Sequence, residues 1–159
     1  QLLGLVEPGS APAPVERFTF PAQSPELLLI DDELGIIEVW RDDLVRGEYP
    51  EEAMRIFTSG EEAAAYVKAH SVEICLLDVQ LLSPYSVLGE YTSGIRILRA
   101  IKAQSPGAKV ILISGFVTEA MAREAILELG ATYHLKKPFR MSDVRIIVQW
   151  AIDQLGSRQ

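Results

Sequence analysis

The chain of 159 residues is long enough for one domain with a buried core, and its composition is ordinary for a globular protein. Its net charge of −7 and its lack of a basic run argue against direct binding to nucleic acid. No apolar stretch approaches the roughly 20 residues that span a bilayer, and Leu2 to Val6 is too short for a secretory signal. We therefore expect a cytoplasmic protein that makes no membrane contact.

Residues 1–25 differ from the rest, because they hold five of the nine prolines among Ala, Ser and Gly. Proline removes a backbone donor and fixes φ, so this stretch is predicted to be a linker or an extended arm. Phe18 and Phe20 are candidates to hold the arm to the domain surface, and an untethered tail is the open alternative. Because the sequence starts at Gln1 and not at Met, we expect a piece of a longer chain or a processed one.

Residues 26–155 alternate between apolar runs and amphipathic stretches. The apolar runs predict five short strands, at about 27–30, 55–58, 74–78, 109–113 and 133–135. The one cysteine, Cys75, falls inside the third run and is expected to be a core thiol. Residues 156–159 are expected to form a short tail.

A helix pattern follows each strand. The first places Ile37, Trp40 and Leu44 on one face. The second opens with a capping box at Ser59 and is expected to bury Ala63, Tyr66 and Val67. The other three are expected over Gly94–Gln104, from Thr118 to Gly130, and from Ser142 onward. Strands that alternate with helices predict an α/β domain, a doubly wound parallel sheet covered on both faces.

Acidic and polar residues follow the predicted strands where each one ends. Asp31 and Asp32 follow the first strand, Asp78 ends the third and Ser114 follows the fourth. Carboxyl ends of parallel strands share one edge, so these side chains are expected to converge there. Carboxylates so close need a compensating cation, and Mg²⁺ suits such an oxygen-rich site, with Lys137 as a second positive charge. This layout favours formation of an aspartyl-phosphate.

Taken together, these motifs resemble the receiver domain of bacterial two-component response regulators. The family pattern is an acidic pair, an acceptor Asp, a Ser or Thr and a Lys-Pro, each after a successive strand. In this sequence the pattern is met by Asp31-Asp32, Asp78, Ser114 and Lys137-Pro138-Phe139. The resemblance covers about Glu26 to Leu155 and implies a flavodoxin-like (βα)5 fold with strand order 2-1-3-4-5.

The resemblance also implies a role for each matched residue. Asp78 would be the phosphoacceptor and, with Asp32, a direct metal ligand, while Asp31 would hold a metal-bound water. Gln80 would offer its backbone carbonyl to the metal, and Lys137 would contact the phosphoryl group. The metal would be Mg²⁺.

The same resemblance implies a conformational switch. Ser114 would move inward on phosphorylation together with His134, which stands where the family commonly has Tyr or another aromatic residue. The change would reshape the face of the fourth helix, fifth strand and last helix, which is also a candidate homodimer surface. The sequence departs from the family at about 82–93, an insertion beside the expected site, since Gly94 follows Asp78 later than the family's glycine does.

The expected function is a phosphoacceptor switch that takes a phosphoryl group from a histidine kinase or a histidine phosphotransfer domain. Its output would pass to a downstream domain or protein. Such a domain is not an enzyme, apart from catalysing its own phosphorylation and dephosphorylation; bulky Phe116 beside the site predicts slow to moderate dephosphorylation. Two alternatives are a phosphorylation-independent interaction module and a haloacid-dehalogenase-like phosphatase, which would need an Asp at Gln80.

Overall fold

The computed structural model describes residues 20–78, 93–114, 130–136 and 141–156. Within these residues one sheet contains five parallel strands in the order β2-β1-β3-β4-β5. The strands are β1 (Leu27–Ile30), β2 (Met54–Phe57), β3 (Ile74–Asp78), β4 (Lys109–Ser114) and β5 (Tyr133–Lys136). The predicted flavodoxin-like fold and its strand order are thus confirmed.

The apolar runs form strands because both faces of the sheet are covered. All four residues of β1 are buried, and so are all five of β3, so neither strand shows the alternation of a half-exposed strand. Strand β2 starts one residue before the predicted Arg55, because the register pairs Leu27 with Met54. Cys75 is a buried free thiol of β3, as predicted, and its burial raises the pKa of the thiol.

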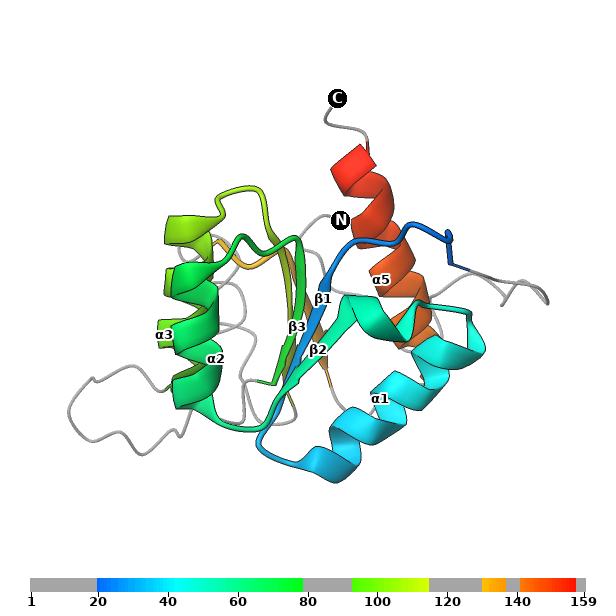
Figure 1. The fold of residues 1–159 in the computed structure, drawn as a ribbon, viewed down its shortest axis with the longest axis horizontal. Helices are drawn as coiled ribbons and strands as arrows, with labels where there is room; N and C mark the ends of the chain where they lie inside the picture. Colours follow the sequence, from blue (N-terminus) through cyan, green and yellow to red (C-terminus); the bar gives the residue numbers. More distant parts are fainter. Residues whose placement is uncertain (1–19, 79–92, 115–129, 137–140, 157–159) are drawn as a thin grey trace.

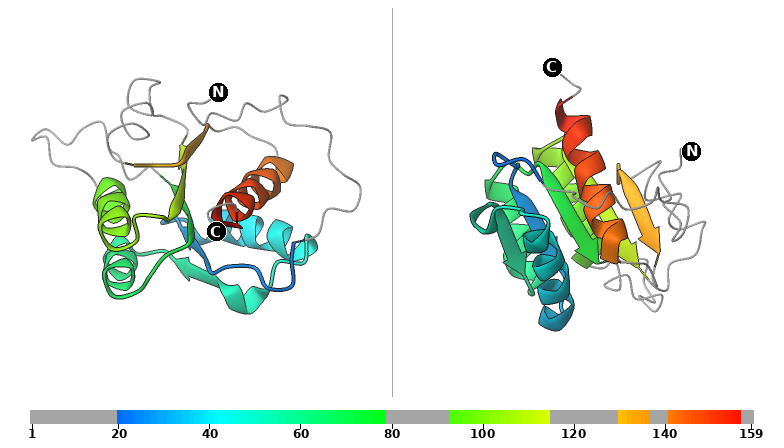
Figure 2. Two further views of the ribbon diagram at one scale, coloured as in Figure 1. Left: turned by 90° about the horizontal axis from the view of Figure 1, so that it is seen from above. Right: turned by 90° about the vertical axis from the view of Figure 1, so that its right-hand side faces the viewer.

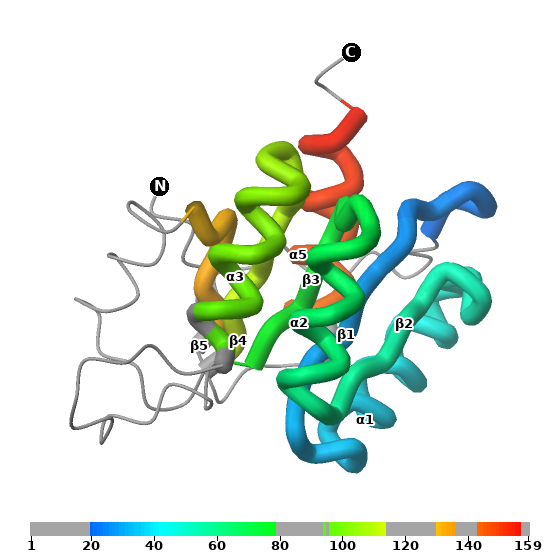
Figure 3. Tube along the Cα trace, turned by 60° about the vertical axis from the view of Figure 1, so that its left-hand side comes forward, coloured from blue at the N-terminus to red at the C-terminus, as the bar shows by residue number. Residues whose placement is uncertain are grey.

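In the described part of the chain, helices cover both faces of the sheet (Figures 1 and 2). Helices α1 (Leu34–Arg46) and α5 (Met141–Gly156) pack on one face, where their apolar residues join those of β1, β3 and β4. Helices α2 (Gly60–Ala69) and α3 (Ser93–Gln104) lie side by side on the other face, as Figure 3 shows. A short 3-10 turn, η1 (Glu51–Ala53), leads into β2.

The predicted face of α1 and the predicted start of α2 are confirmed. The expected residues of α1, Ile37, Trp40 and Leu44, are buried, and at the start of α2 the Ser59 hydroxyl accepts a hydrogen bond from the Glu62 backbone N–H at 3.3 Å. Tyr66 of α2 was expected to be buried but is only partly so, because its hydroxyl reaches Glu26 at the surface. Gly130 has a φ of 83°, a left-handed conformation that glycine adopts without steric cost.

Some predicted features lie outside the described residues. These are the arm before Phe20, the insertion up to residue 92, the fourth helix, and the positions of Gln80, Phe116 and Lys137. Ser114 is described only as the last residue of β4. In the part of the chain that is described, no helix combines the length and the apolar character needed to cross a membrane.

Candidate functional site: an acidic cluster at the carboxyl edge of the sheet

Three carboxylates meet where β1 and β3 end. Asp31 directly follows β1, Asp32 comes next, and Asp78 is the last residue of β3. One carboxylate oxygen from each lies within 4.8 Å of the other two. The clustering follows from the parallel register, which pairs Ile30 with Leu77 and so brings the two strand ends to one level. The predicted convergence of these carboxylates is confirmed.

Two of the three carboxylates are buried, and the third is open to solvent. Asp31 and Asp78 have an exposed fraction of 0%, whereas Asp32 is exposed. The Asp31 carboxylate accepts a hydrogen bond from the Glu33 backbone N–H through Oδ1, at 2.9 Å. Its other oxygen, Oδ2, is buried without a hydrogen-bond partner in the described part of the chain. A buried carboxylate oxygen left in this state is suited to a cation.

The electrostatics of Asp31 point the same way. Burial is the main cause that raises its pKa to about 8, and the neighbouring Asp78 carboxylate raises it further. The Glu33 backbone N–H opposes the rise, because it stabilises the charged form. A divalent cation next to this carboxyl group would lower its pKa, because the cation stabilises the ionised form.

The chemistry of the three residues fits Mg²⁺. Carboxylate oxygens are hard ligands, and Mg²⁺ is usually bound through one or two carboxylates while it keeps several waters. Asp31, Asp32 and Asp78 would hold the ion, with the open side above Asp32 left for water or a phosphate group. The predicted fourth contribution, the backbone carbonyl of Gln80, lies outside the described residues.

The remaining predicted site residues belong to the neighbouring strands. Strand β4 ends at Ser114, which the register pairs with Lys136 at the end of β5. Lys137, outside the described residues, is next in the sequence. His134 is buried, with 4% of its surface exposed, and pairs with Leu112 of β4. The backbones of Ser114 and His134 therefore lie two residues apart along paired strands, while the side chain of Ser114 is not described.

Sequence reasoning missed one contributor, the Glu33 backbone N–H that holds Asp31. The signal was present, because an Asp side chain commonly accepts from the backbone N–H two residues later in an Asx-turn. A long-range feature was also left open, namely the burial of Phe20 against the domain. No local pattern could have given that contact, since its partner Gly47 is far away in the sequence.

Comparison with known proteins identifies the family of the chain. A profile of the response regulator receiver domain matches residues 27–149. The photosynthetic apparatus regulatory protein RegA of Rhodovulum sulfidophilum is 28% identical over 123 residues, which cover 77% of this chain and 60% of RegA. The chain thus spans less than two thirds of that relative.

Solved structures agree with the fold. A CheY-like receiver domain protein from Methanospirillum hungatei JF-1 superposes with a TM-score of 0.71 at 18% identity, covering 86% of this chain and all of the other. A response regulator protein from Burkholderia pseudomallei superposes with a TM-score of 0.61 at 19% identity, covering 84% of this chain and 72% of the other. With the family profile matching most of its length, the chain belongs to the receiver domain family of two-component response regulators.

Proposed function

We propose that this receiver domain is a Mg²⁺-dependent phosphoacceptor switch and that Asp78 accepts the phosphoryl group. One observation carries the proposal: Asp78 ends β3 inside a cluster of three carboxylates whose oxygens lie within 4.8 Å of one another. Such a cluster weakens the fold unless it binds a cation, so its presence calls for a function. The structure of the Burkholderia pseudomallei response regulator is described as having a phosphorylated aspartic acid and a calcium ion, which supports this chemistry by analogy of fold.

In the proposed reaction a carboxylate oxygen of Asp78 attacks the phosphorus of a phosphohistidine. The new P–O bond forms as the donor's P–N bond breaks, and the departing imidazole takes a proton from solvent. When bound, Mg²⁺ would neutralise charge on the phosphoryl oxygens. Asp32 and Asp78 would bind the cation directly, Asp31 would hold one of its waters, and the amine of Lys137 would pair with a phosphoryl oxygen.

The signal would then pass through Ser114 and His134. The Ser114 hydroxyl would donate to a phosphoryl oxygen, and the ring of His134 would follow it inward, as in the family's aromatic switch. The surface that this change would alter includes Tyr133 of β5 and Trp150 of α5. Their rings contact edge to face, with centroids 4.0 Å apart. That surface is where we place the contact with a downstream domain or a second copy of the chain.

The donor would be a histidine kinase or a histidine phosphotransfer domain, and the domain would act in the cytoplasm. It would turn over no substrate besides its own phosphoryl group. The alternative, an interaction module that works without phosphorylation, gains nothing from the acidic cluster, because such a module has no need of three converging carboxylates.

The test is the intact mass of the protein after brief, cold incubation with acetyl phosphate. Wild type is expected to gain about 80 Da, one phosphoryl group, only when Mg²⁺ is present. Asp78→Asn should gain nothing. Asp42→Asn, which removes an exposed carboxylate of α1, is the matched control and should behave as wild type. Wild type without an adduct, or with one that survives in Asp78→Asn, would overturn the assignment and favour the phosphorylation-independent module.

A further inference from the structure

The segment just before β1, residues 20–26, is attached to the domain at both ends. Phe20 is 5% exposed and belongs to the core cluster beneath α1 and α5. Its backbone N–H donates to the carbonyl oxygen of Gly47 at 2.7 Å. Its ring meets that of Tyr49 edge to face, with centroids 4.9 Å apart. The end of the predicted arm is therefore seated in the domain.

Gly47, just after α1, provides the seat for the Phe20 ring. A Cβ atom at this position would lie 3.0 Å from Cε2 of Phe20 and 3.3 Å from Cδ of Arg145. Its φ of −84° is open to any residue, so the backbone alone does not call for glycine. A glycine is explained here by the close approach of Phe20 from one side and of α5 from the other.

Next to Gly47, an ion pair joins α1 to α5. The Nε atom of Arg145 on α5 lies 3.0 Å from Oδ2 of Asp43 in the last turns of α1. Asp43 is buried, and burial raises its pKa while the Arg145 guanidinium lowers it. The Asp43 side chain is 9% exposed and that of Arg145 is 30% exposed, so separating the pair would leave the buried Asp43 carboxylate without a compensating charge. Phe20 therefore packs at the junction that holds α1 against α5.

The middle of the segment is also fixed. Tyr49 is buried, and its hydroxyl donates a hydrogen bond to the carbonyl oxygen of Pro25. Burial is the main cause that raises the pKa of this hydroxyl, so it stays a donor at any physiological pH. The Ser24 hydroxyl donates to the carbonyl oxygen of Pro21 at 2.6 Å, which closes a turn within the segment.

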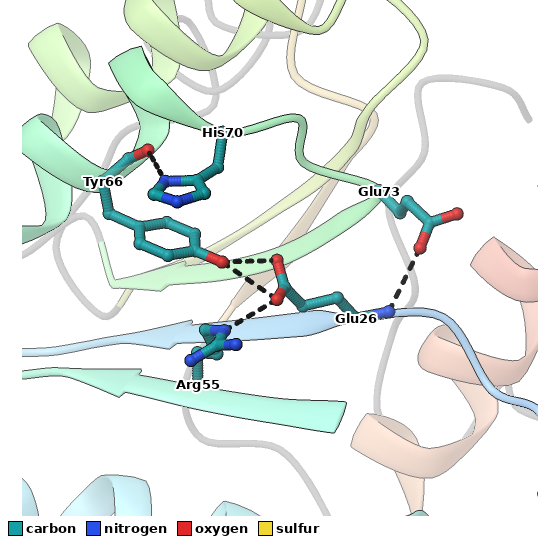
Figure 4. A network of polar contacts seen from close by, with 5 residues as sticks. All are labelled: Glu26, Arg55, Tyr66, His70 and Glu73. Carbon is teal, nitrogen blue, oxygen red and sulfur yellow. Dashed lines mark hydrogen bonds and ion pairs between the residues drawn. The ribbon is translucent and has the colours of Figure 1, made fainter. Parts of the chain in front are cut away.

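The last residue, Glu26, reaches the opposite layer (Figure 4). Its carboxylate accepts from the Tyr66 hydroxyl of α2 at 2.9 Å and pairs with Nε of Arg55 on β2 at 2.7 Å. Its backbone N–H donates to the Glu73 carboxylate at 3.1 Å, and the Tyr66 ring stacks on His70. Glu26 thus fastens the segment to β2 and to the end of α2.

We propose that residues 20–26 form a strap that couples the chain before the domain to the packing of α1 against α5. A flexible linker would absorb a displacement of the preceding chain. Because Phe20 packs against Gly47, a displacement of the preceding chain would instead be transmitted to the ion pair of Asp43 and Arg145. The strap thereby makes the position of α5 depend on what precedes the domain. It stands on contacts far from Asp78 and does not depend on the proposed phosphorylation.

Hydrogen exchange on the full chain tests the strap. Phe20→Ala should speed exchange at least tenfold in the last turn of α1 and in residues 143–148 of α5, and leave α3 unchanged. Gly47→Ala, which fills the seat without straining the backbone, should give the same pattern and serves if Phe20→Ala does not fold. Val39→Ala, at a half-exposed position of α1, is the control and should change neither region.

Coupling between two sites must work in both directions. Arg145→Gln, which removes the charge that joins α5 to α1, should therefore speed exchange of the Phe20 amide, measured by NMR. Phe20→Leu, which keeps an apolar side chain in the seat, should restore most of the slow exchange in α5. Exchange that rises equally in all helices, that does not rise in α5, or that leaves the Phe20 amide unaffected by Arg145→Gln would overturn the proposal.

Discussion

The acidic cluster makes a quantitative prediction about stability and pH. The perturbation is Asp31→Asn, which replaces the buried carboxylate by an amide of nearly the same shape. Wild-type Asp31 has its pKa raised from 3.8 to about 8, mainly by burial. Between these two values the folded protein holds a proton that the unfolded chain has released. The wild-type protein without metal should therefore lose stability as pH rises from about 4 to about 8.

The size of the effect follows from the same values. One pKa unit corresponds to about 1.4 kcal/mol, so the full rise would be worth roughly 5 kcal/mol at pH 8. The exposed Asp32 keeps the cluster in contact with water, and we therefore expect on the order of 2 kcal/mol. Without metal, Asp31→Asn should be more stable than wild type by that amount at pH 8 and by a smaller amount, on the order of 1 kcal/mol, at pH 5, since the unfolded-state pKa is 3.8.

The assay is urea unfolding at pH 5 and pH 8, in EDTA and in Mg²⁺. At a Mg²⁺ concentration ten times the dissociation constant, wild type should gain about 1.4 kcal/mol. Asp31→Asn should lose much of that gain, because it has lost one of the three carboxylates that would hold the ion. Asp42→Asn is the control and should follow wild type throughout. The reasoning is refuted if Asp31→Asn shows no greater stability than Asp42→Asn at pH 8 in EDTA.

Three further predictions concern single positions. Ser59→Ala removes the hydroxyl that caps α2 and should cost about 1 kcal/mol in urea unfolding; an unchanged midpoint would mean that the cap contributes nothing. Glu48 has a φ of 65°, a conformation that is strained for a residue other than glycine, so Glu48→Gly should raise the free energy of unfolding by up to about 1 kcal/mol. A clear loss of stability would show that the backbone at Glu48 is not strained. Phe116→Asn should shorten the lifetime of the acyl-phosphate about tenfold, because the amide can orient the attacking water. The lifetime is measured by phosphate release, and an unaltered value would show that Phe116 does not slow dephosphorylation.

The sequence alone determined the elements and the place of the site. The runs at residues 27–30 and 74–77 are apolar throughout, and a short run of this kind between polar residues is typical of a strand buried on both faces. Parallel strands share their carboxyl edge, so Asp31, Asp32 and Asp78 had to meet once the sheet was inferred. This information is local, because periodicity and strand direction are set by residues close together in the chain.

Tertiary structure decided which side chains meet over long distances. No period or spacing links Phe20 to Gly47, or Asp43 to Arg145, and Tyr66 was expected in the core because its helix position allowed it. Each of these contacts depends on how layers stack and on where a segment crosses the edge of the sheet. The degree of burial of Asp31, and with it the rise of its pKa, likewise arises only when β1, β3 and α1 are packed together.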